Sequence, residues 1–455
     1  MTTTHSTSDT IYDAIVIGGG PAGATAALQM RREGLTVLVL DRAQHPRFHI
    51  GESFLPRMMA LLKELGLEER LSKLPQVEKW GAEFAWAEEP EKSMHFRFDG
   101  GLPGVGCTYA FNIERAVFDN MLLRAAQDEG AVVRENVTVK DVPVMRDGEV
   151  EVETSAGRVK GRWLIDASGQ GSFLGKLLKT RKVIEGHRKI AFFGHFKNVD
   201  RKPMPVGGYP TIVMYKEGWF WMIPINSEVV SIGMVMDADE AKKLPVKHDQ
   251  ALLWAVARVP HIANQLKNAE LPKDNHILAD FSYRCEPFAG NGYFLVGDAA
   301  VFVDPIFSTG ACMGMMGGVR VGQTVAKLVR GAKNVDQLKK SYCGYVHNSS
   351  KYFFNMIRMY HHQNFRELFM EGQGPLQVHR AVISLLAGNV FPPAPPWSIR
   401  WRMWYFRACV WAQKHVALGP KRPTWSIFDA PEPGPLPGMH ARAEVKPHRE
   451  TAGAV

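Results

Sequence analysis

The fold of this chain is decided by the stretch IYDAIVIGGGPAGATAALQMRREGLTVLVLD, residues 11–41. Residues 11–17 and 35–40 are short apolar segments typical of buried β-strands. Residues 21–33 between them have the composition of a helix that ends at Gly34. A strand, a helix and a second strand within about 30 residues predict a βαβ unit with parallel strands.

The turn between the first strand and the helix carries a phosphate-binding pattern. Gly18, Gly20 and Gly23 fit G-x-G-x-x-G, in which the first glycine allows the tight turn, the second lets the backbone approach a pyrophosphate, and the third lets helix and strand pack closely. The positive N-terminus of the helix points at the phosphates. Asp41 ends the next strand, where an acid accepts hydrogen bonds from a ribose hydroxyl. The prediction is a dinucleotide site that also includes the flanking residues Ala22 and Arg42.

Length and composition describe a globular protein of two or three domains. The chain has 455 residues, of which 45% are hydrophobic and 22% are charged. These values exclude a disordered, collagenous or coiled-coil protein. The five cysteines form no C-x-x-C pair, and no cluster of His, Cys and Asp has the spacing of metal ligands, so no metal is predicted.

The charge and the N-terminus bear on partners and location. A net charge of +9 favours anionic partners such as nucleotide cofactors or acidic proteins, and is too weak to indicate nucleic acid. The first ten residues, MTTTHSTSDT, lack the positive charges of a signal peptide. The one long apolar run, residues 14–30, is broken by glycines and reads as strand, turn and helix. We therefore expect a cytoplasmic protein, and the sequence does not favour a membrane partner.

Two further segments indicate which dinucleotide is bound. YFLVGDAA at residues 293–300 is a strand that ends in Gly-Asp, where Asp298 suits the ribityl hydroxyls of a flavin. LIDASG at residues 164–169 is a second strand-to-turn element. With the first glycine motif, and in the same order, these segments resemble the flavoprotein monooxygenases of the para-hydroxybenzoate hydroxylase type. The resemblance implies FAD as the cofactor.

The expected fold class is α/β, with a three-layer FAD-binding domain of the Rossmann type, an inserted antiparallel β-sheet and a C-terminal helical region. We expect the FAD-binding domain to comprise residues 1–185 and 275–334. Residues 186–274 are rich in strand patterns and form a β-sheet insertion on the substrate side. Residues 335–429 form the helical substrate or lid region, and residues 430–455 are a Pro/Gly linker with a polar tail.

A third group of motifs narrows the chemistry. Residues 218–224, GWFWMIP, contain the pattern W-x-W-x-I-P. Gly-Glu-Ser at residues 51–53, KWGAEF at residues 79–84 and DPIFSTG at residues 304–310 accompany it. In this combination, which spans residues 10–370, the chain resembles the flavin-dependent halogenases.

The resemblance implies a reaction in three stages. Reduced FAD reacts with oxygen to form a flavin hydroperoxide, a bound chloride or bromide attacks it, and hypohalous acid results. The oxidant moves through an internal tunnel to a lysine, which holds it or becomes a haloamine, and an electron-rich aromatic substrate then attacks the halogen. Because the chain has no convincing second nucleotide motif, we expect a separate flavin reductase to supply reduced FAD by diffusion.

The resemblance also assigns roles to individual residues. Lys79 matches the catalytic lysine, and burial would lower the pKa of its amine as this role needs; the alternative is an ordinary surface lysine. The backbone N–H groups of Thr309 and Gly310 hold the halide; the alternative is a glycine turn that packs against the flavin. Ser53 and Arg115 contact FAD, although an arginine on a helix is often simply exposed.

The tryptophan motif and one departure from the family concern the substrate. Trp219, Trp221 and Pro224 are thought to shield the flavin from hydroxylation; the alternative is plain core packing, since W-x-W places both rings on one face of a strand. Halogenases of free tryptophan carry a glutamate where this chain has Phe307. The departure implies the branch that acts on phenols, pyrroles or aromatic acyl groups tethered to a carrier protein.

The C-terminal segment has an unusual composition. Residues 372–428 contain no Asp or Glu and seven Lys or Arg. Tryptophans recur there on one face of a helix, which predicts a basic, aromatic amphipathic helix. The favoured interpretation is a lid that packs its tryptophans over the substrate channel; docking of an acidic acyl carrier protein and attachment to a membrane surface are alternatives. The tryptophans are Trp397, Trp401, Trp404 and Trp411.

Two other functions compete with halogenation. An aromatic hydroxylase would use the same oxygen chemistry without a halide. A flavoprotein that reduces prenyl or lipid chains would use the basic helix as a membrane contact. Lys79 and the W-x-W pattern favour the halogenase.

Overall fold

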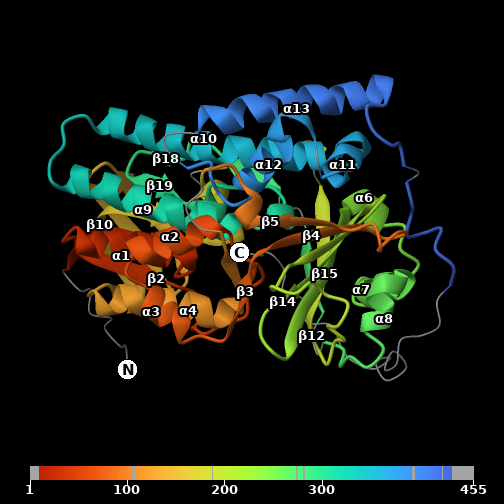
Figure 1. Ribbon diagram of the computed structural model, residues 1–455. Coiled ribbons are helices and arrows are strands. Elements are labelled where there is room, and N and C mark those ends of the chain that lie inside the picture. Colours follow the sequence, from red (N-terminus) through yellow and green to blue (C-terminus); the bar gives the residue numbers. More distant parts are fainter. Residues whose placement is uncertain are drawn as a thin grey trace.

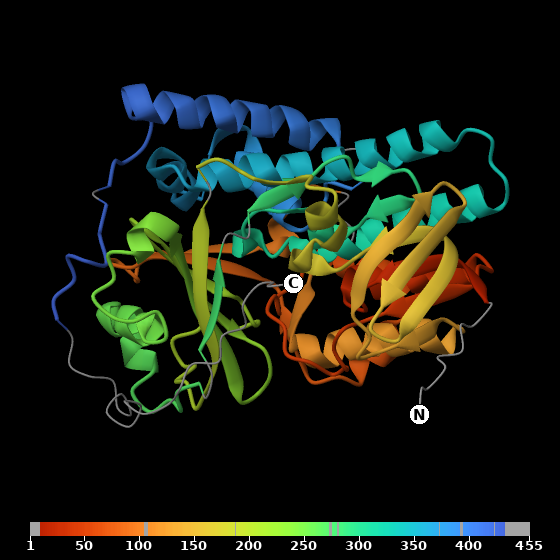
Figure 2. The same cartoon turned by 180° about the vertical axis from the view of Figure 1, so that it is seen from behind.

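The computed structural model describes residues 10–432 except 104–107, 187, 273–274, 280–281, 373, 392–394 and 423. The molecule is built around two large β-sheets that lie side by side, as Figure 1 shows from one side and Figure 2 from behind. Helices from the C-terminal part of the chain extend along one edge of both sheets. The tail expected at residues 430–455 lies outside the described residues from position 433 onward.

The first sheet contains the predicted βαβ unit. β1 (Ile11–Ile17) pairs in parallel with β2 (Val37–Leu40), and α1 (Pro21–Arg32) connects them. On its other side β1 pairs in parallel with β10 (Gly157–Asp166), which pairs in parallel with β19 (Tyr293–Leu295). Parallel strands covered on both faces read as continuous apolar runs, and all four residues of β2 are buried. This arrangement confirms the α/β fold with a Rossmann-type sheet.

The remaining strands extend this sheet or form small ones beside it. β7 (Val132–Arg134) and β18 (Ala289–Gly290) are its edges, and β8 (Val139–Arg146) and β9 (Glu149–Thr154) form a hairpin paired to β10. A three-stranded sheet holds β11 (Arg181–Val183), β17 (Tyr283–Cys285) and β20 (Val301–Phe302), and a two-stranded sheet holds β3 (Gln76–Lys79) and β6 (Ala110–Ile113).

The packing of α1 against α9 (Gly310–Val329) joins two parts of the chain that are nearly 300 residues apart. Gly314, Gly318 and Gly322 repeat every fourth position of α9 and face α1. A Cβ atom on Gly318 would lie 2.6 Å from the carbonyl oxygen of Ala22, and one on Gly322 would lie 2.7 Å from the side chain of Gln29. Only glycine permits this approach of the two backbones.

The second sheet has seven strands. In order they are β16 (His276–Ala279), β12 (Lys189–Lys197), β15 (Val229–Asp237), β14 (Gly218–Pro224), β13 (Thr211–Tyr215), β4 (Gly81–Trp86) and β5 (Met94–Arg97). All neighbours are antiparallel except β13 and β4, which run in parallel. The sheet is therefore larger than the insertion expected at residues 186–274, because β4 and β5 before it and β16 after it also belong to the sheet.

Both faces of the second sheet are covered. Trp219 and Trp221 of β14 share an apolar cluster with residues of the first sheet and its helices. Phe220 and Met222, which alternate with them, belong to a separate cluster with α7 (Ala251–Arg258). The remaining helices of this part of the chain lie in the connections between strands. They are α2 (Pro56–Glu64), α3 (Glu68–Ser72), α4 (Arg115–Asp128), α5 (Phe173–Leu177), α6 (Ala238–Ala241) and α8 (Pro260–Gln265).

The C-terminal helices form the outer layer. They are α10 (Val335–Tyr360), α11 (Gln363–Met370), α12 (Val378–Leu386) and α13 (Trp397–Val416). α13 packs on α11 and α12 and is the outermost helix in both views (Figures 1 and 2). Among the described residues, no helix is long and apolar enough to cross a bilayer.

The structure corrects the expected role of the C-terminal tryptophans. Trp397, Trp404 and Trp411 are 72%, 70% and 67% exposed, so they do not pack over a substrate channel. α13 buries a different stripe of side chains, which includes Ile399 and Phe406. The expectation failed because this helix carries large hydrophobic residues on two opposite faces, and the sequence pattern does not say which face is buried.

Two alanine substitutions test the close packing of α1 and α9. We expect Gly318→Ala to lower the free energy of unfolding by about 1–3 kcal/mol, because its Cβ would meet the α1 backbone. Gly344→Ala, in α10, should raise it by about 0.5–1 kcal/mol, because nothing lies within 4 Å of that Cβ and alanine favours helix. Denaturant unfolding of both variants measures the difference, and equal effects would contradict the packing argument.

Candidate active site

The predicted phosphate-binding turn is shaped for close backbone approach. Gly18 has a φ of +99°, and a Cβ there would lie 2.4 Å from the carbonyl oxygen of Ala167. A Cβ on Gly23 would lie 1.9 Å from the carbonyl oxygen of Gly18. Gly20, in contrast, faces open space, with the side chain of Arg47 its nearest neighbour at 3.6 Å. The turn thus leaves its second glycine available to a ligand, as a pyrophosphate requires.

Asp41 lies at the end of β2, beside this turn. Its carboxylate accepts hydrogen bonds from the backbone N–H groups of Gly19 at 2.7 Å and Ala43 at 2.8 Å. Asp41 is buried, whereas the neighbouring Arg42 is exposed. The acid therefore orients the glycine turn itself, and its carboxylate has further oxygen lone pairs that can accept from a ligand.

The Gly-Asp motif meets the same turn. Ala22 of α1 touches both Gly297, before Asp298, and Gly314 of α9, since a Cβ on Gly297 would lie 3.0 Å from the Ala22 Cβ. The hydroxyl of Tyr283 donates to the Asp298 carbonyl oxygen at 2.7 Å. Desolvation raises the pKa of the Asp298 carboxyl to about 6, although the Arg115 guanidinium opposes this shift. With this pKa the carboxyl is mostly ionised at neutral pH and can accept hydrogen bonds from hydroxyl groups of a ligand.

Arg115 holds the loop that crosses this region. It is the first residue of α4 and forms a paired ion contact with Asp119, at 2.7 and 3.0 Å. The same guanidinium donates to the carbonyl oxygen of Ile50 at 2.8 Å. Arg115 is buried, so the alternative of an exposed helix arginine does not apply, and its direct hydrogen bonds go to Asp119 and to this loop.

Buried polar atoms without partners mark the space that a cofactor needs. The hydroxyl oxygen of Ser53 and Oε2 of Glu52 are buried and form no hydrogen bond, and buried Nη1 of Arg47 has only an ion contact of 3.7 Å with Asp119. Such groups are costly unless a ligand or water satisfies them. Together with the open Gly20, they show that the residues around the turn fit a large polar cofactor.

A carboxylate–imidazole pair was not anticipated. Glu52, of the Gly-Glu-Ser motif, contacts the His195 ring in a short hydrogen bond. Burial favours the neutral imidazole, but the Glu52 carboxylate outweighs this and raises the pKa of His195. His195 lies on β12, so the pair ties the second sheet to the loop at residues 51–53. Nothing in the spacing of the two residues, 143 positions apart, signals this contact.

Lys79 is buried, not on the surface. It ends β3, is only 3% exposed, and donates a hydrogen bond from Nζ to the carbonyl oxygen of Phe54 at 2.9 Å. Nζ also lies 5.3 Å from the centre of the Phe98 ring. Burial lowers the pKa of the Lys79 amine to about 7. The surface-lysine alternative is therefore wrong.

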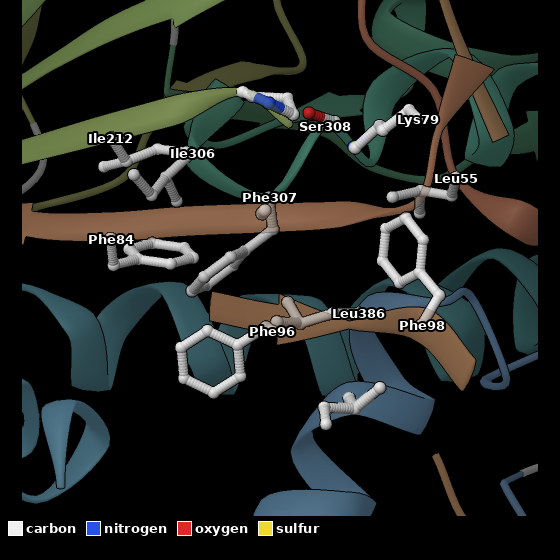
Figure 3. A pocket seen from close by; sticks show the side chains of 13 residues that line it. Leu55, Lys79, Phe84, Phe96, Phe98, Ile212, Ile306, Phe307, Ser308 and Leu386 are labelled. Carbon is white, nitrogen blue, oxygen red and sulfur yellow. The ribbon is translucent and has the colours of Figure 1, made fainter. Parts of the chain in front are cut away.

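The Lys79 side chain lines an apolar pocket between the second sheet and α12 (Figure 3). Lys79 and Ser308 are the polar residues of this pocket, and no carboxylate is among the described residues that line it. Phe307 lies in the wall, 4% exposed, and packs against Phe84 and Tyr360. α12 closes the pocket on one side, so this helix takes the place expected for the tryptophans. The other lining residues are Leu55, Ala82, Phe96, Phe98, Pro210, Ile212, Ile306, Ile383 and Leu386.

Thr309 and Gly310 lie at the start of α9. The first N–H groups of a helix have no intrahelical acceptor and attract anions. Whereas Ser308 lines the Lys79 pocket, Thr309 and Gly310 line a second, smaller pocket together with Asp304. The Asp304 carboxylate accepts from the backbone N–H of Ile306 at 3.0 Å and contacts the His361 ring.

Both tryptophans of the W-x-W pattern are core residues. Trp219 and Trp221 are 2% and 5% exposed, and their rings lie 5.7 Å apart. Nε1 of Trp221 donates to the hydroxyl of Ser231 at 3.2 Å, whereas Nε1 of Trp219 is buried without a partner. Pro224 ends the same strand and is buried. The same two rings thus pack in the core and form a wall that faces the first sheet.

The comparisons with known proteins place these features in a family. A family described as "FAD binding domain" matches residues 11–346. The chain is 35% identical over 334 residues to the 1H-pyrrole-2-carbonyl-[peptidyl-carrier protein] brominase of Pseudoalteromonas luteoviolacea, covering 70% of this chain and 78% of that protein. It is 30% identical to the corresponding chlorinase of Pseudomonas fluorescens over 416 residues, 84% of this chain and 90% of that one. The chain belongs to the flavin-dependent halogenases.

Solved structures agree with this assignment. The halogenase resembles the flavin-dependent brominase Bmp2 with a TM-score of 0.76 and 31% identity, over 88% of this chain and 100% of that one. It resembles the myxobacterial chondrochloren halogenase CndH with a TM-score of 0.70 and 31% identity, over 76% and 82%. The halogenase binds FAD and uses halide and oxygen.

The burial of the Lys79 amine has a consequence for stability. Above pH 7 the folded halogenase keeps this amine neutral, while the unfolded chain binds a proton up to about pH 10. The free energy of unfolding of the wild type should therefore rise with pH relative to Lys79→Met, by up to about 1.4 kcal/mol per pH unit between pH 7 and 10. Denaturant unfolding at several pH values measures it.

Lys73→Met is the matched control for this experiment. The Lys73 side chain is 70% exposed and pairs with Glu69, so its removal should leave the pH slope close to that of the wild type. Parallel curves for wild type and Lys79→Met would show that the Lys79 amine is not desolvated as the structure indicates.

Proposed function

We propose that this halogenase transfers an electrophilic halogen to an electron-rich aromatic ring, and that Lys79 presents the halogen to the substrate. The observation that carries the proposal is a buried amine in an apolar pocket without a carboxylate among the described lining residues. A charged surface lysine could not occupy this position. An amine with a pKa near 7 can either donate a hydrogen bond or accept the halogen covalently.

When bound, reduced FAD would react with oxygen and so supply the two-electron oxidation that converts halide to hypohalous acid. The residues proposed to hold the cofactor are those around the glycine turn and the loop at residues 51–53. The residues are Gly18, Gly20, Ala22, Gly23, Asp41, Arg42, Ser53, Arg115 and Asp298. Arg115 acts on this loop through Ile50 and keeps Glu52 and Ser53 facing the cofactor space.

The halide is proposed to bind the backbone N–H groups of Thr309 and Gly310, where α9 begins. The partial positive charge of a helix N-terminus attracts a halide, even though Asp304 lines the same pocket and a carboxylate oxygen of Asp298 lies 3.6 Å from a Cβ placed on Gly310. Thr309 is 3% exposed, so a bound anion there is shielded from bulk water. Ser308, which directly precedes Thr309, lines the Lys79 pocket, so the proposed halide site and this pocket are adjacent along the chain.

Trp219, Trp221 and Pro224 are proposed to keep water and substrate away from the flavin. The two rings lie in the cluster that joins the second sheet to the first. A dry wall on this side forces the oxidant to leave by the Lys79 pocket. Hypohalous acid then reaches the substrate only after it has come into contact with the Lys79 amine.

The lining of the pocket supports an electron-rich aromatic substrate. Phe307 and its neighbours offer no charge that would stabilise a cationic intermediate, so the ring itself must be a strong nucleophile. Pyrroles and phenols meet this condition. Two relatives are named for the halogenation of a pyrrole-2-carbonyl group on a peptidyl carrier protein, which favours a carrier-bound pyrrole here. A flavin reductase is the proposed source of reduced FAD.

A reconstituted assay tests this function. The enzyme is supplied with a flavin reductase, NADH, FAD, oxygen and bromide or chloride, with free and carrier-bound pyrroles and phenols. Mass spectrometry should show halogenated products, and Lys79→Met should lower their formation at least about 100-fold while a chemical trap still captures hypohalous acid. Lys73→Met, which removes an exposed lysine six residues away, should retain full activity.

The same assay separates the competing functions. Products heavier by one oxygen atom, formed without halide, would identify a hydroxylase instead. Full halogenation by Lys79→Met would remove the lysine from the mechanism while leaving the reaction class intact.

A further inference from the structure

The outer side of α13 carries a regular row of tryptophans and cations. Trp397, Trp404 and Trp411 are about 70% exposed, and Arg400, Arg407 and Lys414 are exposed beside them. We call these six residues the tryptophan–arginine face. Neither the proposed chemistry nor the Lys79 pocket uses any of them.

The spacing makes this face straight. The tryptophans follow one another at intervals of seven residues, and so do the cations three positions further on. Seven residues are close to two full helical turns, so each row drifts by only about 20° per repeat. The buried stripe of α13, which includes Met403 and Val410, lies about 130° around the helix from the tryptophan row and about 70° from the cation row, so the cations lie between the tryptophans and the buried side. α13 has 20 residues and thus presents a linear face about 30 Å long.

The face is uniformly positive. No Asp or Glu occurs between residues 372 and 428, so α13 carries no acid that could neutralise its cations. Three exposed indole rings without an apolar cover are also unfavourable in water. An occupant of this face must therefore be anionic and must offer an apolar or interfacial environment to the rings.

The direction of the face limits the occupant further. α12 lies between α13 and the Lys79 pocket, to which it contributes Ile383 and Leu386. The tryptophan row is turned away from the buried stripe of α13, and α13 itself is the outermost helix in Figures 1 and 2. Two packed helices place it roughly 20 Å from the pocket. A carrier protein bound there would hold its tethered substrate on the wrong side of both helices.

We propose that the tryptophan–arginine face binds the surface of an anionic lipid bilayer. Indole rings prefer the interface between water and lipid, and arginine and lysine bind lipid phosphates. A straight row of both on an outermost helix matches a planar surface. The halogenase would lie on the membrane without crossing it, with its pocket on the far side of α12.

Two other occupants match the face less well. A second copy of the chain would bring two sets of three cations together, which costs free energy by repulsion. Residues 433–455 of the same chain contain three Lys or Arg and two Asp or Glu, and so offer no complementary negative charge.

Sedimentation of the full chain with lipid vesicles tests the proposal. We expect binding to vesicles of phosphatidylcholine with phosphatidylglycerol, and binding about 100-fold weaker to phosphatidylcholine alone, from the loss of three charge contacts. A triple variant with Arg400→Gln, Arg407→Gln and Lys414→Gln should show the same loss of vesicle binding. A triple variant with Trp397→Ala, Trp404→Ala and Trp411→Ala should bind the vesicles at least about tenfold more weakly. It should also lose the blue shift of indole fluorescence that vesicle binding causes in the wild type.

A matched control removes the same charge elsewhere. A triple variant with Lys182→Gln, Lys267→Gln and Lys333→Gln, three lysines that are exposed elsewhere on the chain, should leave vesicle binding unchanged. All three variants should keep the wild-type rate with a free aromatic substrate, which shows that they are folded.

The following results would overturn the proposal. Wild-type protein that ignores anionic vesicles, or that binds neutral and anionic vesicles equally, contradicts it directly. A raised KM for a carrier-bound substrate in the tryptophan variant, without vesicle binding by the wild type, would assign the face to a carrier protein. A dimer that dissociates in the tryptophan variant, again without vesicle binding, would assign it to a second copy.

Discussion

The close contact between α1 and α9 is the constraint on which the rest of this structure depends. Glycine at every fourth position of α9 lets its backbone approach that of α1 to a distance that no Cβ atom would permit. This packing brings the N-terminus of α9 and the Gly-Asp turn against the phosphate-binding turn of α1. One helix pair thereby positions both ends of the proposed flavin site, and through Ser308 also one wall of the Lys79 pocket.

The second sheet completes the site from the other side. Its strand β4 follows directly on Lys79, and the alternation of β14 turns the two tryptophans toward the first sheet. The lysine is thus held where two apolar layers meet. Among the described residues no acid lies close enough to stabilise its charge, so burial alone lowers its pKa. The pKa of this amine is set by the apolar residues that surround it and not by a charged partner.

The sequence predicted the features that are local in the chain and left out those that are not. The βαβ unit, the start of α9 and the strand with W-x-W are each contained in a short segment with its own periodicity. The Glu52–His195 pair joins residues from distant segments, and no spacing rule brings them together. The tryptophans of α13 were misread for a related reason. A helix with two apolar faces has two possible buried sides, and the fit of Ile399 and its neighbours against α11 and α12 decides between them.

The sequence by itself determined the family, the cofactor and the identity of the candidate lysine, because motif chemistry depends on residue types at short, defined intervals. Only the tertiary structure decided that Lys79 is buried, that α12 closes its pocket, and that three tryptophans face outward. Burial is the physical reason for the difference. Burial depends on which surfaces meet after the chain has folded. The same residue has a different pKa, partner and function when it is buried than when it is exposed to solvent.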